Sequence, residues 1–260
     1  MKTTIYYFTG TGNSLWAAKT IGNALPDSTL IPILRHTEIS NEESEITGIV
    51  APVYAWGTPL IVEELIKTLD YKRCGYLFVV SVNAGGVAGT NIAIKKMVAA
   101  RGGALSAGFS LPLVSNYILF GNPPSQEKID NIIDNGRKKL ENIISSIKAR
   151  KTDILEKDGA FKNLILGAIN KTFRSQMKKA DKKFTTDEKC NGCGICSKIC
   201  PAENITVENG RPVWHQRCEQ CLACMHWCPE TSINSGAGTK GKKRYHHPEV
   251  TLYDLLRRNA

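Results

Sequence analysis

Cysteines are the residues of this sequence whose type and spacing most clearly indicate chemistry. Eight of the nine fall within one short stretch, whereas Cys74 stands alone. The first four have the spacing C-x2-C-x2-C-x3-C-P: Cys190, Cys193, Cys196 and Cys200. The same spacing recurs without an insertion at Cys218, Cys221, Cys224 and Cys228. Disulfides suit this pattern poorly, because the recurring spacing is that of metal or iron–sulfur ligands.

The repeat extends beyond the cysteines. Pro201 and Ile205 map onto Pro229 and Ile233, which indicates two copies of one small structural unit. Two structural zinc sites are an alternative, since four thiolates also suit zinc. Zinc ribbons, however, pair two C-x2-C knuckles across a long spacer and do not need four closely spaced cysteines that end in proline. The pattern therefore favours two [4Fe-4S] clusters, which are electron-transfer groups.

Residues 184–235 resemble a bacterial-type two-cluster ferredoxin. Gly194 follows the second cysteine as in that family, and Asn209-Gly210 predicts a hairpin turn; Leu222, at the position that matches Gly194, is a departure. In two-cluster ferredoxins the fourth cysteine of each run binds the other cluster. The resemblance implies one cluster on Cys190, Cys193, Cys196 and Cys228. It implies the second cluster on Cys218, Cys221, Cys224 and Cys200.

A second candidate site begins at the polar loop Thr9-Gly10-Thr11-Gly12-Asn13-Ser14, between an expected strand and an expected helix. Backbone N–H groups at a helix N-terminus, together with hydroxyl groups, can bind a phosphate without a cation, and glycines permit close approach. The loop lacks the lysine of a Walker A motif and the third glycine of GxGxxG. ATP and a conventional dinucleotide site are therefore disfavoured.

Two further loops belong to the same candidate site: Val53-Tyr54-Ala55-Trp56-Gly57 and Asn83-Ala84-Gly85-Gly86. Each follows an expected strand, and the carboxyl ends of neighbouring parallel strands meet at one crevice. The three loops resemble those of the flavodoxin family, in which the first holds the FMN phosphate and the others flank the isoalloxazine ring. The resemblance implies FMN as a cofactor, with Tyr54 or Trp56 at the position of a stacking residue.

Packing into the core is the alternative role for either of these two aromatic rings. Ser115-Asn116-Tyr117 and residues 121–124 are further candidates to close over the edge of the flavin.

Strand and helix patterns alternate through the first 150 residues. Strands are expected at 3–8, 30–34, 46–53, 76–82 and 104–111, and helices at 15–25, 59–69, 90–101 and 125–150. This alternation is typical of the α/β class with a doubly wound parallel sheet. The resemblance to flavodoxins implies a five-stranded sheet with the order 2-1-3-4-5. A basic amphipathic helix is expected over 157–183.

The chain is thus expected to have four parts. A flavodoxin-like, FMN-binding domain spans 1–150, a helical connector spans 151–183, a smaller α+β ferredoxin domain spans 184–235, and a basic tail spans 236–260. The formal net charge is +10, and most of the positive excess lies in residues 151–260, which carry 19 basic and 12 acidic side chains. His246-His247 in the tail has no metal-ligand spacing and is expected to face solvent.

Composition sets the remaining expectations. The chain has 260 residues, of which 42% are hydrophobic and 22% charged, as in ordinary globular proteins. No apolar run approaches the ~20 residues that cross a bilayer, and no signal-peptide pattern is present, so a cytoplasmic location without a transmembrane segment is expected. The basic excess, which includes Lys240, Lys242, Lys243 and Arg244, is interpreted as stabilising the clusters, as docking an acidic redox partner, or as a solvated face, rather than as a site for nucleic acid. The basic helix is interpreted first as a linker that packs its apolar stripe on one of the two domains, and it leaves peripheral membrane contact and a dimer open.

The whole order of parts resembles flavodoxin–ferredoxin fusion proteins of anaerobic bacteria and archaea. This resemblance implies an electron-transfer protein that relays electrons between FMN and two [4Fe-4S] clusters, and so couples one-electron to two-electron steps. Two alternatives stay open. One is a stand-alone FMN-dependent reductase of a small substrate, fed by the clusters. The other is a non-redox docking module whose flavodoxin-like domain holds no flavin. A carrier is favoured over an enzyme, because no general base or nucleophile is implicated.

Overall fold

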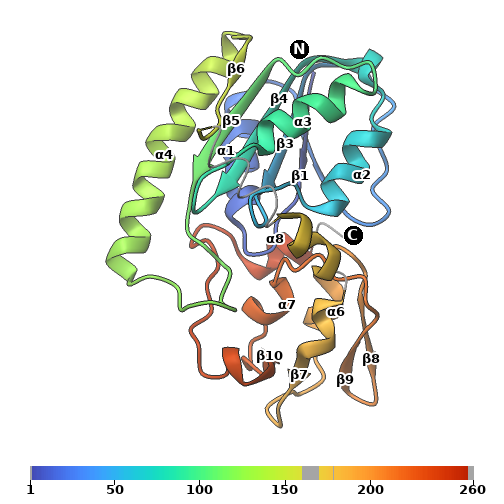
Figure 1. The fold of residues 1–260 in the computed structure, drawn as a ribbon, viewed down its shortest axis with the longest axis vertical. Helices are drawn as coiled ribbons and strands as arrows, with labels where there is room; N and C mark the ends of the chain where they lie inside the picture. The colour runs from blue at the N-terminus through green and yellow to red at the C-terminus, as the bar shows by residue number, and fades with distance from the viewer. Residues whose placement is uncertain (1, 160–169, 178, 257–260) are drawn as a thin grey trace.

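The computed structural model describes residues 2–159, 170–177 and 179–256. Figure 1 shows a sheet with flanking helices, built from the first half of the chain, above a smaller part that contains the cysteines. The expected helix over 157–183 lies partly outside the described residues; within them, 170–177 is helical, whereas 157–159 is not. Within the described ranges no helix is both long and apolar enough to cross a bilayer.

Six parallel strands form the sheet, in the order β2-β1-β3-β4-β5-β6. They are β1 (Thr3–Tyr7), β2 (Ser28–Pro32), β3 (Ser44–Pro52), β4 (Cys74–Asn83), β5 (Ala107–Pro112) and β6 (Ile154–Leu155). The predicted class and the predicted order of the first five strands are confirmed. The expectation of five strands and of a connector helical from residue 151 is wrong, because Ile154 and Leu155 pair with β5. Two residues are too few to produce a periodic signal.

The helices of the sheet domain are α1 (Asn13–Ala24), α2 (Leu60–Thr68), α3 (Thr90–Ala99) and α4 (Gln126–Lys148), with a short 3-10 turn, η1, at Tyr71–Arg73. Helix α1 packs beside α4, and α2 packs beside α3, so each pair covers one face of the sheet (Figure 1). The central strand β4 is buried from Tyr76 to Asn83. Burial on both faces explains its continuous apolar run.

The smaller part is made of short elements. They are η2 (Ala180–Lys183), β7 (Phe184–Thr186), α6 (Ile195–Lys198), β8 (Ile205–Glu208), β9 (Arg211–Trp214), α7 (Ala223–His226), β10 (Ile233–Ser235), η3 (Gly236–Thr239) and α8 (Leu252–Leu256). Strands β8 and β9 form the predicted hairpin, whose turn residues Asn209 and Gly210 have φ of 49° and 72°. β7 pairs with β10 in an antiparallel ladder.

The two cysteine repeats adopt the same local conformation. Gly194 has φ of 73° and precedes α6, and Leu222 has φ of 59° and precedes α7. A left-handed conformation costs a residue with a side chain about 1 to 2 kcal/mol. Leu222 is buried, so its packing offsets that cost, and the departure from the ferredoxin pattern leaves the backbone geometry intact.

The two folds meet at the loop that follows β1. A Cβ atom on Gly10 would lie 2.2 Å from the carbonyl oxygen of Cys221, so only glycine allows the two backbones to approach this closely. The indole N–H of Trp227 donates to the carbonyl oxygen of Gly10 at 2.9 Å. The cysteine loop therefore lies directly against the first loop of the candidate phosphate site.

The C-terminal segment crosses the same loop from the other side. The N–H of His247 donates to the carbonyl of Thr11 at 2.8 Å, and its imidazole stacks on Trp16 with ring centroids 4.6 Å apart. The expectation that His246-His247 faces solvent is wrong for His247, which is fully buried. His246 is exposed as expected, and its ring stacks on Trp227 with centroids 4.4 Å apart. Trp16 is far from His247 in the sequence, so no local pattern could reveal that contact.

Burial lowers the pKa of His247 to about 4, repulsion by Arg137 adds to this shift, and attraction by Glu249 opposes it. Because this value lies below the ordinary value of 6.5, protons bind preferentially to the unfolded chain. The stability that His247 contributes is complete above pH 6.5 and is lost as the pH falls toward 4, by up to about 3 kcal/mol. We expect His247→Gln to flatten the pH dependence of thermal unfolding between pH 7.5 and 5. Identical pH profiles for the two proteins would contradict this.

The contact at Gly10 makes a second prediction. Gly10→Ala forces the Cys221 loop away and should lower the free energy of unfolding by about 2 to 3 kcal/mol. Gly85→Ala is the matched control, because a Cβ there meets nothing within 4 Å and Gly85 lies in the same candidate site. Its effect should stay within about 0.5 kcal/mol in denaturant unfolding. Equal effects of the two substitutions would show that the contact at Gly10 does not hold the folds together.

Candidate functional site

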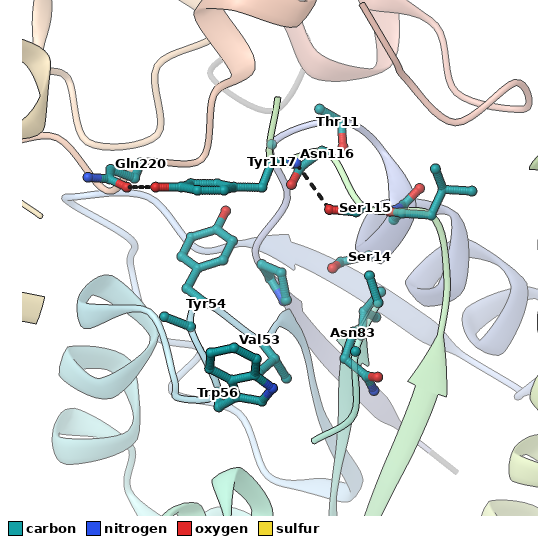
Figure 2. A pocket seen from close by; sticks show the side chains of 18 of the residues that line it. Thr11, Ser14, Val53, Tyr54, Trp56, Asn83, Ser115, Asn116, Tyr117 and Gln220 are labelled. Atoms are coloured by element: carbon teal, nitrogen blue, oxygen red, sulfur yellow. Dashed lines mark hydrogen bonds between the residues drawn. The ribbon is translucent and has the colours of Figure 1, made fainter. Parts of the chain in front are cut away.

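A cavity of about 350 Å³ opens where strands β1, β3, β4 and β5 end, and Figure 2 shows the side chains that surround it. The three loops singled out in the sequence all contribute to its lining. Of their residues, only Gly12 and Gly57 lie outside the lining. The volume is that of a site for one small-molecule ligand.

The first loop lines the cavity with backbone and hydroxyl groups. The N–H of Gly12, whose φ is 98°, donates to the hydroxyl of Thr9 at 3.1 Å and closes the turn before α1. Ser14 lies in the first turn of α1, and its hydroxyl points into the cavity (Figure 2). None of the described residues that line the cavity is charged. An anion here would be held by neutral donors and by the helix N-terminus.

Gly12 shapes the loop from outside the cavity. A Cβ atom at this position would lie 2.9 Å from the Cβ of Val250, which belongs to the C-terminal segment. The glycine therefore allows the tail to cover the outer side of the phosphate-type loop.

The second loop is a tight hairpin turn. Tyr54 and Gly57 exchange backbone hydrogen bonds of 2.9 and 3.0 Å, and the two residues between them, Ala55 and Trp56, have φ of 44° and 63°. Positive φ at a non-glycine residue costs energy and is typical of functional sites. The turn presents the rings of Tyr54 and Trp56 to the cavity (Figure 2).

The third loop is held by the side chain of Asn83. Its Oδ1 accepts the N–H of Gly86 at 2.9 Å, and its Nδ2 donates to the hydroxyl of Ser110 at 2.8 Å. Because both ends of this amide are used, Asn83 shapes the loop rather than offering its side chain to a ligand. Ala84, Gly85 and Gly86 present mainly backbone to the cavity.

A fourth segment, after β5, joins the cavity to the cysteine-rich part. The hydroxyl of Tyr117 donates to Oε1 of Gln220 at 3.0 Å, and Nδ2 of Asn116 donates to the carbonyl of Cys221 at 3.3 Å. Ser115, Asn116 and Tyr117 line the cavity as expected, whereas residues 121–124 do not. The cavity is therefore built from both folds.

Three lining residues had no signal in the sequence: Phe120, Phe173 and Gln220. Phe120 is 90% exposed and packs its ring against Tyr117, with centroids 5.1 Å apart. Phe173 belongs to an apolar helix stripe that predicts only packing. Gln220 lies between two cysteines of the other fold, and only tertiary contact brings it to the cavity.

A buried histidine fixes the position of Asn116. Nδ1 of His226 accepts the N–H of Tyr245 at 2.9 Å, so its Nε2 carries the proton and donates to the carbonyl of Asn116 at 2.7 Å. Burial lowers the pKa of His226 to about 4 and keeps the ring neutral. The tail, the cysteine loop and the cavity loop are thereby connected through one side chain.

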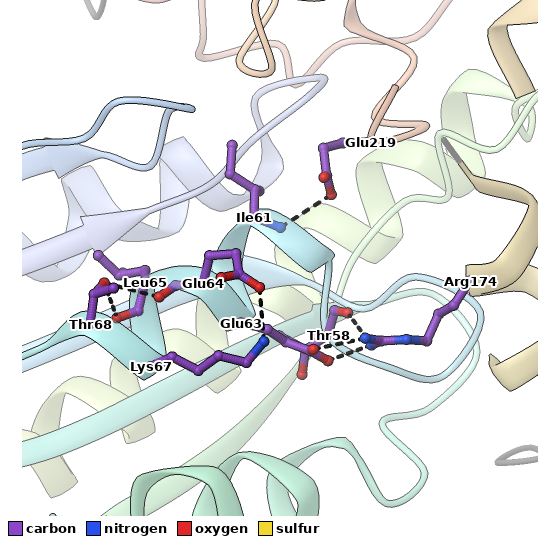
Figure 3. Close-up of polar contacts among 9 residues, drawn as sticks. All are labelled: Thr58, Ile61, Glu63, Glu64, Leu65, Lys67, Thr68, Arg174 and Glu219. Atoms are coloured by element: carbon purple, nitrogen blue, oxygen red, sulfur yellow. Dashed lines mark hydrogen bonds and ion pairs between the residues drawn. The ribbon is translucent and has the colours of Figure 1, made fainter. Parts of the chain in front are cut away.

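The helix over 170–177 and the loop between Cys218 and Cys221 hold Thr58 and the start of α2, which directly follow the second cavity loop (Figure 3). Arg174 forms a two-pronged ion pair with Glu63 and donates to the carbonyl of Thr58 at 3.3 Å. The buried carboxylate of Glu219 accepts the N–H of Ile61 at 3.3 Å, in the first turn of α2, where the helix dipole favours negative charge.

Asn170 ties the connector to the hairpin turn. Its Nδ2 donates to the carbonyls of Tyr54 and Ala55 at 3.1 and 3.2 Å. A Cβ atom on Gly57 would lie 2.3 Å from the same amide nitrogen. Gly57 is therefore needed for packing against the connector, not for lining the cavity.

The cysteines lie in two neighbouring groups. Burial raises the pKa of the Cys196 thiol to about 11, and repulsion from Cys193, Cys228 and Cys190 adds to this shift. Burial likewise raises the pKa of Cys218 and Cys224, and repulsion from Cys221 and from Cys200 of the other repeat adds to both shifts; Cys196 also repels Cys224. Cys228 lines one small cavity together with Cys190, Cys193 and Cys196. Cys200 lies near Cys218 and Cys224 of the opposite repeat.

Backbone donors point at the sulfur atoms. The N–H of Asn204 donates to Sγ of Cys200 at 3.3 Å, and the N–H of Gln220 donates to Sγ of Cys218 at 3.2 Å. Such bonds favour a thiolate. Among the described residues no three His, Cys, Asp or Glu side chains converge to hold a single metal ion. The four cysteines of a [4Fe-4S] cluster each bind a different iron, so they need not converge on one point, and the two groups fit two such clusters.

The two groups differ in exposure. Cys218, Cys221 and Cys224 are buried, whereas Cys193 is exposed and Cys190, Cys196 and Cys228 are half-buried. The buried group lies beside the cavity, through the contact of Cys221 with Gly10. The other group lies nearer the protein surface.

Comparison with known proteins identifies the cysteine-rich part. Residues 186–206, which include the first cysteine run, match the 4Fe-4S binding domain family. No curated protein matches the chain.

Solved structures similar to this chain include a flavoprotein in complex with FMN from Lactobacillus acidophilus, at 14% identity over 42% of this chain and 91% of that one, with a TM-score of 0.38. A flavodoxin from Streptococcus pneumoniae TIGR4 aligns at 11% identity over 55% and 99% of the two chains, with a TM-score of 0.34. A flavodoxin from the domain Archaea aligns at 13% identity over 55% and 99%, with a TM-score of 0.36.

The fold of the first part is established by its own strand order, β2-β1-β3-β4-β5, with helices on both faces. The second part is identified by its match to the 4Fe-4S binding domain. The chain therefore combines a flavodoxin-like α/β fold and a 4Fe-4S ferredoxin-type region in one polypeptide, which is the organisation of a flavodoxin–ferredoxin fusion protein.

Proposed function

We propose that this chain is an electron carrier that binds FMN in the cavity and two [4Fe-4S] clusters on its cysteines, and relays electrons between them. One observation carries the proposal: the backbone of Cys221 packs against Gly10, within the loop that would hold the FMN phosphate. A direct backbone contact leaves little distance between the two redox sites. When bound, FMN exchanges one or two electrons and each cluster exchanges one.

Different cavity residues would bind different parts of FMN. The loop Thr9–Ser14 would bind the phosphate through backbone N–H and hydroxyl groups, which suits a cavity whose described lining residues are all uncharged. Tyr54 and Trp56 would flank the ring system, and the backbone of residues 83–86 would face its edge. The hydrogen bond from Tyr117 to Gln220 would exclude water on the side of the clusters.

The cysteines would be shared across the repeat. Cys190, Cys193, Cys196 and Cys228 would hold the first cluster, and Cys218, Cys221, Cys224 and Cys200 the second. The electrostatic neighbours of Cys196, Cys218 and Cys224 support this assignment.

Burial suggests an order for the relay. The second cluster would lie next to FMN, because three of its four ligands are buried and one of these, Cys221, contacts Gly10. The first cluster would exchange electrons with a partner protein, because Cys193 is exposed. Exposed Lys189 and Lys240 line a groove beside the first ligand loop, which favours an acidic redox partner.

The proposal is tested by assaying iron, acid-labile sulfide and extracted flavin in protein purified without oxygen. About eight irons and one FMN per chain are expected, and both chromophores should bleach on chemical reduction. Full iron without flavin, even after incubation with FMN, would contradict the relay and support a docking module. Turnover of a small acceptor without any partner protein would instead support a stand-alone reductase.

A further prediction follows from the proposal that each cluster takes its fourth cysteine from the other repeat. Cys228→Ala should lower the iron content from about eight to about four or fewer per chain, because the first cluster loses the ligand that the second repeat supplies. Cys74→Ala is the matched control, since this cysteine lies outside both groups and should leave iron unchanged. About eight irons in the Cys228→Ala protein would refute the shared ligand sets.

A further inference from the structure

Arg244 lies where the C-terminal segment leaves the cysteine-rich part, and its guanidinium is held in one position. One terminal nitrogen donates to the carbonyl of Ile233 and to Oδ1 of Asn234, both at 2.9 Å, and the other donates to the carbonyl of Thr239 at 3.3 Å. All three acceptors belong to β10 and the η3 turn that follows it. A planar fork with several fixed acceptors is rigid, unlike the flexible ammonium of lysine.

This fixed charge lies near cysteines of both groups. Ile233, whose carbonyl accepts from Arg244, packs in one apolar cluster with Cys224 and Cys228. Burial lowers the pKa of Arg244, and attraction to Cys228 and Cys224 opposes that shift. Cys228 belongs to the first ligand set and Cys224 to the second, so the charge acts on both. Because Arg244 is only partly exposed, water screens its charge less than it screens a surface lysine.

One donor of Arg244 has no partner. The Nε atom is buried and forms no hydrogen bond with any described residue, although the other nitrogens of the guanidinium do. A buried donor without an acceptor is unfavourable, because it has lost its hydrogen bonds to water. Sulfur atoms of a cluster or of its cysteines would supply acceptors at this position, next to Cys224 and Cys228.

We infer that Arg244 raises the reduction potentials of both clusters, through its fixed positive charge and through a hydrogen bond from its N–H at Nε to sulfur. The C-terminal segment is therefore part of the redox centre. The inference rests on the proposed function. Reduction adds one electron, and thus one negative charge, to a cluster; a nearby positive charge stabilises that form. No bond of Arg244 forms or breaks, and no proton is transferred. Arg244 is a positioning and tuning residue, not a ligand.

The test is an anaerobic redox titration of the full, cluster-loaded chain, followed by electron paramagnetic resonance. Arg244→Leu should disfavour reduction of both clusters, each by about tenfold, which is about 59 mV for one electron. Arg244→Lys, which keeps the charge, should give a smaller change. Lys243→Leu is the matched control: it removes one positive charge from the neighbouring, exposed position, where water screens it, and should shift the potentials least.

A merely structural role for Arg244 would lower stability without moving the potentials. Equal potentials in Arg244→Leu and Lys243→Leu, with full iron and sulfide in both, would overturn the inference. If the Arg244→Leu protein does not load clusters, the same titration is made on Arg244→Gln, which removes the charge and keeps a polar side chain. Unshifted potentials in Arg244→Gln would also overturn the inference. Wild-type protein that holds no iron would refute the proposed function instead.

Discussion

The close approach of two backbones at Gly10 and Cys221 is the constraint on which the rest of this structure depends. It brings a loop at the edge of the parallel sheet against a cysteine loop that lies more than 200 residues away in the chain. Trp227 and Asn116 add one hydrogen bond each across the same boundary. The cavity is completed only when both folds are in contact, because Gln220 and Phe173 come from outside the sheet domain.

Hydrophobic packing makes this arrangement a single body rather than two tethered domains. The apolar cluster around Leu222 and Met225 includes Ile118, from the loop after β5. In return, Ile199 and Trp227 of the cysteine-rich part belong to the main core of the sheet domain. A small, cysteine-rich unit buries little apolar surface alone, and here it shares the core of a larger neighbour. A shared core favours a constant distance between the cavity and the buried cysteines.

The C-terminal segment strengthens the same boundary from the opposite side. Its backbone bonds to Thr11, the imidazole of His247 stacks on Trp16, and Tyr245 contacts both His226 and Asn13. The segment thus reaches the phosphate-type loop, the loop after β5 and, through Arg244, the strand beside the cysteine groups. A basic tail, which composition describes only as charged, makes specific contacts with the first cavity loop and with the cysteine-rich part.

Local patterns in the sequence determined the α/β class, the first five strands, the three cavity loops and the cysteine repeat. These features depend on residues close together in the chain, whose periodicity and turn chemistry can be read directly. The order of the five strands followed instead from the resemblance of the loops to those of flavodoxins. Tertiary structure alone decided the pairing of Ile154 and Leu155 with β5, the burial of His247, and the placement of Gln220 beside the cavity. Each of these depends on packing between residues far apart in sequence, and a single histidine or glutamine carries no sign of the partner it will meet. The left-handed backbone of Leu222 shows the same limit, since burial in a shared core overrides a local preference.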